Sequence, residues 1–247
     1  MRVEGFKKWR ERENIELIAL DGDDTLWRTV PIFRKMMREC YDYLSVVAPI
    51  ANREEWKARI ERVNDEMFET HGVNPTRWQG VMARVAAETH LAPVVRDEAV
   101  RILMQIYETP PEFIDGSEEG LAFLKETGTY FGIITHADPL WMERKYRWLG
   151  LERFLERGAI YVVDMNGHKV AGSWRGGIRY LGGRPDLTVA AGDSPRSDIG
   201  PAIEAGVKPE HCFLVESQGA NRWSIHDIPV DKRVVRIPSI LALRDLE

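Results

Sequence analysis

Apolar residues follow two different rhythms along the chain. Residues 15–20 form a short apolar run, β-branched in part, with charged residues before it and Asp-Gly after it, which predicts a buried strand. After residue 110, short apolar runs alternate with segments of helical spacing. The predicted strands are 130–135, 159–164, 187–193 and 211–216, with 233–237 as a candidate for one more, and the predicted helices are 118–128, 139–151, 173–182 and 197–206. This alternation predicts an α/β fold in which a Rossmann-like parallel sheet carries helices on both faces.

Residues 31–109 interrupt the alternation directly after the first strand. Four segments there carry apolar residues at helical spacing with charges between them, and they are separated near Pro49, Pro75 and Pro93. A structureless loop of this size does not fit a compact domain, so we expect an inserted all-helical subdomain. The predicted organisation is an α/β core of residues 1–30 and 110–247, with a helical domain of residues 31–109 inserted into it.

Composition and charge narrow the class of protein. The chain has 247 residues, of which 44% are apolar, and this is enough to bury a sizeable core. The formal net charge is −5 without a basic block, so nucleic acid is not an expected partner. No apolar run is long enough for a membrane span, and the N-terminus does not resemble a secretory signal. Cys40 and Cys212 are far apart, which favours reduced thiols in a cytoplasmic protein.

Polar residues gather where three predicted strands end. They are Asp21, Asp23, Asp24, Thr25, Thr135, His136, Asp193 and Asp198. In open parallel sheets, ligands bind beyond the carboxyl ends of the strands. We therefore expect these side chains to share one site.

The expected cluster of carboxylates requires a cation. Carboxylates that converge raise one another's pKa unless a positive charge offsets them. A small set of oxygen ligands favours Mg²⁺, which binds one or two carboxylates together with substrate phosphate. Lys169, in a polar turn before a predicted helix, adds a positive charge, and Thr135 adds a hydroxyl. The combination predicts a pocket for a phosphate dianion beside Mg²⁺.

Four motifs, taken in order, resemble the haloacid dehalogenase-like (HAD) superfamily of phosphohydrolases. They are the DxDx[TV] pattern at Asp21, Asp23 and Thr25, a threonine that ends an apolar strand at Thr135, an upstream lysine at Lys169, and the GDxxxxD pattern at Gly192, Asp193 and Asp198. The resemblance covers residues 15 to about 206. Each motif alone is weak, and a turn with a helix N-cap would explain Asp21–Thr25 equally well without the others.

The resemblance implies a role for each matched residue. Asp21 would be the nucleophile and Asp23 the general acid and base. Asp21, the backbone carbonyl of Asp23 and Asp193 would bind Mg²⁺, with Asp198 supporting the site. Thr135, His136 and Lys169 would contact the phosphate. The helical insertion corresponds to what that family calls a C1 cap, a lid over the active site.

Three positions depart from the family pattern. Asp24 stands where glycine is usual, His136 where asparagine is common, and Val170 follows Lys169 where proline is usual. The last departure leaves the lysine assignment open. Lys145 is the competitor, although it lies inside a strongly helical run and farther from Asp193 along the chain.

The predicted function is a cytoplasmic Mg²⁺-dependent phosphatase that acts on a small phosphorylated metabolite through an aspartyl phosphate. A haloacid dehalogenase is a weaker alternative, because a halide leaves without a proton and that pattern lacks the second aspartate. A phosphomutase acting on a sugar phosphate would use the same residues. A phospho-acceptor or binding protein of the same fold, which does not turn over, is the alternative from another class. The sequence specifies neither the substrate nor the oligomeric state.

Overall fold

The fold is that of a computed structural model, which describes residues 2–166, 168–216 and 229–247. Its main sheet has six strands in the order β5-β4-β1-β6-β7-β8, and every neighbouring pair is parallel. The strands are β1 (Leu17–Leu20), β4 (Phe131–His136), β5 (Ile160–Val163), β6 (Thr188–Gly192), β7 (Cys212–Val215) and β8 (Val235–Ile237). The first strand lies in the middle, so the residues after it reach the site from the centre of the sheet.

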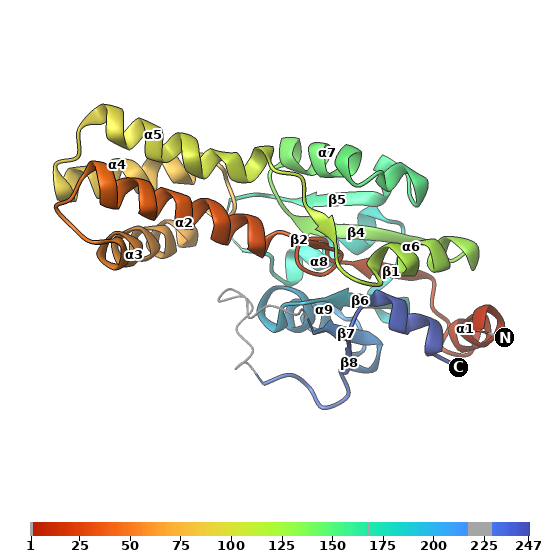
Figure 1. Ribbon diagram of the computed structural model, residues 1–247. Helices are drawn as coiled ribbons and strands as arrows, with labels where there is room; N and C mark the ends of the chain where they lie inside the picture. The colour runs from red at the N-terminus through yellow and green to blue at the C-terminus, as the bar shows by residue number, and fades with distance from the viewer. Residues whose placement is uncertain (1, 167, 217–228) are drawn as a thin grey trace.

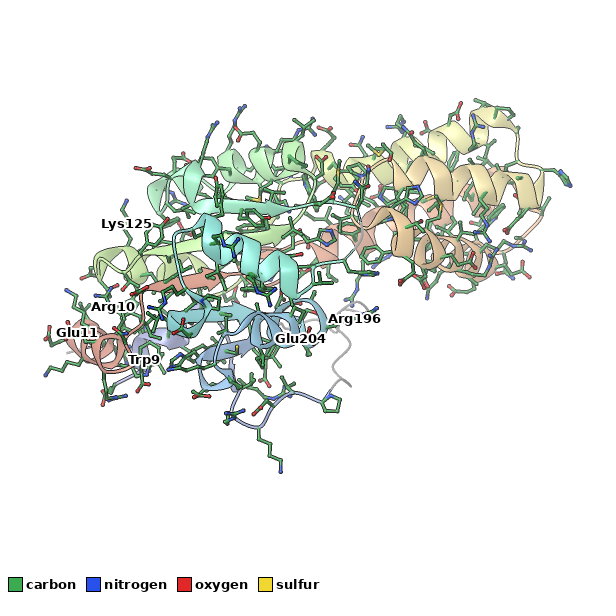
Figure 2. All side chains as sticks on the ribbon, turned by 180° about the vertical axis from the view of Figure 1, so that it is seen from behind. Trp9, Arg10, Glu11, Lys125, Arg196 and Glu204 are labelled. Atoms are coloured by element: carbon green, nitrogen blue, oxygen red, sulfur yellow. The ribbon has the colours of Figure 1, made fainter. Side chains whose placement is uncertain are left out.

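Helices cover the sheet on both faces. Right-handed crossovers put α6 and α7 on one face and α8 and α9 on the other, and in Figure 2, seen from behind, α8 lies in front of the strands. The helices of this part are α1 (Arg2–Arg12), α6 (Ser117–Glu126), α7 (Pro139–Trp148), α8 (Ala171–Tyr180) and α9 (Gly200–Ala205). The predicted α/β class, with a parallel sheet between helices, is confirmed.

A second group of helices stands apart from the sheet. It consists of α2 (Val30–Val47), α3 (Arg53–His71), α4 (Arg77–Thr89) and α5 (Pro93–Met104). Figure 1 shows this group at one end of the molecule and both termini at the other. The predicted proline breaks coincide with the connections, and α3 begins at a capping box in which Asn52 and Glu55 bond each other's backbone N–H groups.

Each part has its own apolar core. One cluster joins the strands to α1, α6, α7, α8 and α9, while the other is formed by α2–α5 and the turn after them. Trp56 and Trp78 are fully buried in the second cluster. Trp141 of α7 also belongs to this second cluster, so α7 ties the two parts together. The exact division into a core and a cap domain stays a prediction.

A short antiparallel ribbon, which was not foreseen, lies where the chain passes between the two parts. Its strands are β2 (Trp27–Arg28) and β3 (Glu112–Phe113). Trp27 is fully buried, and Arg28 donates to Asp115 at 2.9 Å. Both crossings of the chain are therefore fixed side by side, close to the end of β1. Within the described ranges, the helices are too short or too polar to cross a bilayer.

Candidate active site

Lys169 joins two of the predicted site carboxylates. Its Nζ donates to Asp21 Oδ1 at 2.7 Å, to Asp198 Oδ1 at 2.8 Å and to the carbonyl of Ile134 at 2.7 Å. All three side chains are buried. Burial lowers the pKa of Lys169, but the charges of Asp198 and Asp21 outweigh burial and leave this pKa above its ordinary value. Of the two candidate lysines, Lys169 is thus the one beside Asp21.

The loops after β1 and β6 are bound to each other by Thr25. The Thr25 hydroxyl donates to Asp21 Oδ2 at 3.0 Å and accepts the backbone N–H of Asp193 at 2.9 Å. The backbone N–H of Ser194 donates to Asp198 Oδ2 at 3.0 Å. A Cβ atom at Gly192 would clash with the Asp198 side chain, so glycine is needed there for the close approach. The DxDx[TV] and GDxxxxD motifs therefore form one rigid unit.

The residues present fit a divalent cation. Among the described residues, Asp21, Asp193 and Asp198 each offer a carboxylate oxygen, and these oxygens lie within 4.8 Å of one another. Three buried carboxylates face a single ammonium group, that of Lys169, so the ionised cluster carries excess negative charge in a poorly solvated place. An all-oxygen donor set suits a hard ion such as Mg²⁺. The Asp23 side chain is not in this group, and a metal contact through the backbone carbonyl of Asp23 stays a prediction.

Burial and the excess negative charge of this cluster raise the pKa of two of its carboxyl groups. Burial, followed by the charge of Asp198, raises the pKa of Asp21 to about 7 even though Lys169 opposes the shift. Burial and the charges of Asp198 and Asp21 likewise raise the pKa of Asp193 well above its ordinary value. A bound cation would stabilise both carboxylates in their ionised form.

Asp23 is held on the other side of the loop by a buried lysine. Lys145 Nζ lies 2.5 Å from Asp23 Oδ1, and Trp27 Nε1 donates to the same oxygen. Lys145 is fully buried, with its Nζ 3.6 Å from the centre of the Trp141 ring. Trp141 and Lys145 are four residues apart on α7 and therefore share one face of that helix. The Asp138 side chain fixes the start of α7 by accepting the N–H of Trp141 at 2.8 Å. Lys145, the other candidate for the phosphate-binding lysine, thus contacts Asp23 and not Asp21.

Thr135 and His136 end β4 with unsatisfied polar atoms. Among the atoms described, Thr135 Oγ1 and His136 Nε2 are buried without a hydrogen-bond partner. Buried polar atoms without partners are uncommon and point to a ligand or water that completes them. Burial, together with the charge of Lys169, lowers the pKa of His136 to about 4. The imidazole is therefore neutral at pH 7.

The backbone conformation and the contacts of Asp24 account for an aspartate at this position, where the family pattern usually has glycine. Its φ of 59° lies in the left-handed region, which glycine adopts most easily and aspartate tolerates. Its carboxylate accepts the N–H groups of Thr29 and Val30 at 3.0 and 3.1 Å and the Thr29 hydroxyl at 2.8 Å. Burial raises the pKa of Asp24. This side chain faces the start of α2 and links the loop after β1 to the helical group.

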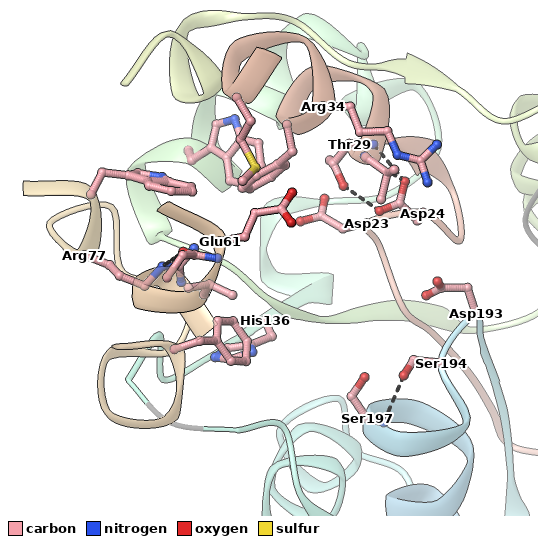
Figure 3. Close-up of a pocket in the computed structure, with 18 of the residues that line it drawn as sticks. Asp23, Asp24, Thr29, Arg34, Glu61, Arg77, His136, Asp193, Ser194 and Ser197 are labelled. Atoms are coloured by element: carbon pink, nitrogen blue, oxygen red, sulfur yellow. Dashed lines mark hydrogen bonds between the residues drawn. The ribbon is translucent and has the colours of Figure 1, made fainter. Parts of the chain in front are cut away.

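These residues open onto one cavity of about 470 Å³ between the sheet and the helical group. Asp21, Asp23, Asp193 and Asp198 line its floor together with Thr135, His136 and Lys169. The polar residues expected at the strand ends therefore line one cavity, except Thr25, which bonds Asp21 and the backbone of Asp193. Figure 3 shows Asp193 across the cavity from Arg77 and His136, with the side chains of Asp23 and Glu61 pointing toward each other between them.

The comparisons with known proteins agree with this geometry. The family model for haloacid dehalogenase-like hydrolases matches residues 15–206. The chain belongs to the haloacid dehalogenase-like hydrolases. Comparison with curated proteins gives no match.

Solved structures similar to this one share its fold at low identity. A haloacid dehalogenase-like family hydrolase from Xanthomonas campestris has 20% identity and a TM-score of 0.73, with 94% of this chain and 89% of that chain covered. An HAD phosphatase from Thermococcus onnurineus has 18% identity and a TM-score of 0.64, with 94% and 97% covered. A 2-haloacid dehalogenase from Pseudomonas syringae has 21% identity and a TM-score of 0.62, with 94% and 97% covered. At these identities the similarity establishes the fold alone.

Two buried charged residues of the site are not evident from the sequence pattern. Arg77 lines the cavity, and Lys145 bonds Asp23 without lining it. Charged residues inside amphipathic helices ordinarily face solvent, so neither burial could be inferred from the spacing. The one available signal for Lys145 was its position four residues after Trp141.

Proposed function

We propose that the chain is a phosphatase that hydrolyses a small phosphomonoester through an aspartyl phosphate on Asp21, with Mg²⁺ as cofactor. The observation that carries the proposal is the pair of carboxylates, Asp21 and Asp23, which line one cavity while serving different partners. Two carboxylates in different environments suit a nucleophile and a proton carrier. A halide leaves without a proton, so a dehalogenase would have no use for Asp23. Cytoplasmic location stays a prediction.

The proposed reaction has two steps. An oxygen of Asp21 attacks phosphorus, the bond from phosphorus to the leaving oxygen breaks, and Asp23 gives that oxygen a proton. Asp23 then takes a proton from water, whose oxygen attacks phosphorus, and the bond to Asp21 breaks to release phosphate. Asp21, Asp193 and Asp198 would hold Mg²⁺, with the backbone carbonyl of Asp23. When bound, Mg²⁺ supplies positive charge that offsets the repulsion between the carboxylates and the phosphate.

The remaining residues would bind and orient the phosphoryl group. Lys169 keeps one Asp21 oxygen fixed at 2.7 Å and adds positive charge beside it. Thr135 Oγ1 has no partner in the described part of the chain, so its hydroxyl is free to donate to a phosphate oxygen. A neutral His136 has a single ring N–H, so its Nε2 would donate to phosphate only in the tautomer that places the proton there. Fixed donors around a developing charge stabilise the transition state without reorganisation.

The proposal is tested by release of products from substrates of three kinds. Purified protein with Mg²⁺ is incubated with a panel of phosphomonoesters, with a sugar phosphate and with 2-chloropropionate. Phosphate released from the esters, without chloride from the haloacid, supports the phosphatase. Transfer of the phosphoryl group to another hydroxyl of the sugar would indicate a phosphomutase. Chloride release would make the protein a dehalogenase, and no turnover of any substrate would contradict the proposed function.

Lys145→Met should slow hydrolysis of alkyl phosphates by about tenfold or more and of aryl phosphates much less. Lys145 and Trp27 both bond Oδ1 of Asp23, and this leaves the other oxygen to serve the leaving group. An aryl oxygen departs without a proton, so an acid out of position matters less to it. Asp23→Asn should show the same dependence on the ester, more strongly. Turnover numbers for matched esters provide the measurement.

Arg147→Met is the matched control for Lys145→Met, because Arg147 lies on the same helix with an exposed side chain paired to Glu143. The Arg147→Met substitution should change the turnover of neither alkyl phosphates nor aryl phosphates. Equal losses for aryl and alkyl esters in Lys145→Met would show that Lys145 does not act through Asp23.

A further inference from the structure

The two halves of the cavity carry opposite charge. Its lining from the sheet side contains five aspartates and one lysine, Lys169. Its lining from α2–α4 contains five basic residues and one acidic residue, namely Arg34, Arg38, Arg53, Lys57, Arg77 and Glu61. The first half would attract a metal ion, and the metal ion in turn would bind the phosphoryl group. The second half therefore favours an anion on the opposite end of the bound molecule.

Most of the basic residues lie toward the outside, where their charges are screened. Arg53 pairs with Asp42 at 2.5 Å and with Glu54 at 2.8 Å. Lys57 lies 3.8 Å from Glu54. Exposed pairs of this kind contribute little to affinity. They do not by themselves define a binding site.

Arg77, at the start of α4, differs from the others because it is buried. Its side chain is 4% exposed, and its Nε donates to Asn64 Oδ1 at 2.9 Å. The guanidinium lies between two aromatic rings, 5.2 Å from the centre of Phe68 and 5.1 Å from that of Trp78. These contacts fix the plane of the group in a wall of the cavity.

One edge of this fixed guanidinium lacks a partner. Arg77 Nη1 is buried and makes no hydrogen bond with any described residue. Burial lowers the pKa of Arg77, while Tyr107 and Asp65 oppose the shift, and an arginine remains charged at neutral pH. A buried, charged N–H group without an acceptor is costly. An anionic oxygen in the cavity would satisfy it.

We propose that Arg77 binds a second anionic group of the substrate, a carboxylate or a second phosphate, at the end away from the bond that is cleaved. The inference rests on the proposed function and specifies its substrate class: a phosphomonoester whose alcohol part also carries an anion. A planar guanidinium held by Asn64 and two rings is organised in advance for carboxylate or phosphate oxygens. Glu61 also lines the cavity and disfavours a second anion beside it, but its carboxylate already accepts from the Tyr41 hydroxyl at 3.4 Å.

The test uses alkyl phosphates of two to six carbons that end in a hydroxyl, a carboxylate or a second phosphate. For the wild-type enzyme with Mg²⁺, we expect kcat/KM at the best chain length to be at least tenfold higher with an anionic end than with a hydroxyl. Arg77→Gln should remove that preference, mainly by raising KM, and should leave the hydroxyl-ended ester within about threefold. The carboxylate and phosphate series identify which anion the site prefers.

Arg84→Gln is the matched control. Arg84 lies on α4 but outside the cavity and pairs with Glu66 at 2.6 Å. Its substitution should change kcat/KM neither for the anion-ended esters nor for the hydroxyl-ended esters. A cooperative melt shows that each variant is folded. If Arg77→Gln does not fold, Arg77→Lys takes its place, and its loss of the planar fork should lower the preference several-fold. Equal losses with charged and uncharged esters in a folded variant would overturn the proposal.

A binding measurement separates this proposal from the proposed function. Calorimetry compares the ω-hydroxy acid of the best chain length with the diol of the same length, in wild type and Arg77→Gln. Tighter binding of the hydroxy acid that depends on Arg77 supports the anion site even if no ester is hydrolysed. Hydrolysis of hydroxyl-ended esters with no preference for the hydroxy acid would overturn the anion site and leave the phosphatase standing.

Discussion

Asp21→Asn should lower turnover of every phosphomonoester by more than about 100-fold, because an amide has nearly the shape of a carboxylate but is a poor nucleophile. Losing a covalent route should cost several kcal/mol of barrier. The amide oxygen can still accept from Lys169, and the amide NH2 can donate to the Thr25 hydroxyl oxygen, which now donates to the other oxygen of Asp21. We therefore expect the fold to persist. Turnover is measured with Mg²⁺ present, and a thermal melt checks the fold.

Asp24→Asn makes the same chemical change three residues along and is the control. Asparagine tolerates a positive φ, and its amide oxygen can accept the N–H groups of Thr29 and Val30 that now bond Asp24. Turnover should therefore fall only slightly. If Asp21→Asn kept more than about one hundredth of the wild-type rate in a folded protein, the nucleophile would have to be another residue.

Removal of divalent metal should abolish turnover, Mg²⁺ should restore it, and Ca²⁺ should inhibit. Mg²⁺ imposes a tight octahedron with ligands at about 2.0–2.1 Å, whereas Ca²⁺ takes more ligands at about 2.3–2.6 Å. Ca²⁺ would engage both oxygens of Asp21 and leave none to attack. Rates after chelation and after addition of each metal provide the measurement. Full activity in metal-free buffer, or equal rates with Ca²⁺, would contradict a role for Mg²⁺.

The metal should also stabilise the fold in a pH-dependent way. The pKa of Asp21, about 7, lies above its ordinary value of 3.8, so between these values the metal-free folded protein binds more protons than the unfolded chain. Its stability should therefore fall as the pH rises through that window. Mg²⁺ competes with these protons, so it should raise Tm more at about pH 8 than at about pH 5. At a concentration near 100 Kd, the rise should be about 5–10 °C. The Asp193→Asn substitution should reduce this rise in Tm.

Much of the fold can be predicted from the local pattern of apolar runs and turn residues in the sequence. Each strand of the main sheet except β8 is a mainly apolar run bounded by turn residues, and a short run of this kind has few other stable arrangements. The common site of the polar residues can also be predicted, because parallel strands present their carboxyl ends at one edge of the sheet. Asp21, Thr135 and Asp193 each follow or end such a strand, so their meeting required only the order of strands.

Contacts across long stretches of sequence could not be inferred in this way. The pair of Lys145 and Asp23 depends on how α7 packs beside the loop after β1, and the two residues are separated by 122 positions. The burial of Arg77 depends on the fit of α3 against α4, where Asn64 supplies its acceptor. The β2–β3 ribbon has two residues per strand, too few for an alternating pattern to be recognised.

The contacts of Asp24 limit the changes in chain length that proteins with this architecture can accept near the active site. The proposed nucleophile, the proposed proton carrier and the residues that anchor α2 all lie within a stretch of ten residues, from Asp21 to Val30. An insertion or deletion in this stretch would change the spacing between Asp24 and the first turn of α2 and break their contacts, so we expect selection to preserve its length. Beyond that first turn, the helical group can exchange residues along its inner wall without disturbing the chemistry. New substrate preferences should therefore arise by substitution in α2–α4 while the stretch from Asp21 to Val30 stays constant in length.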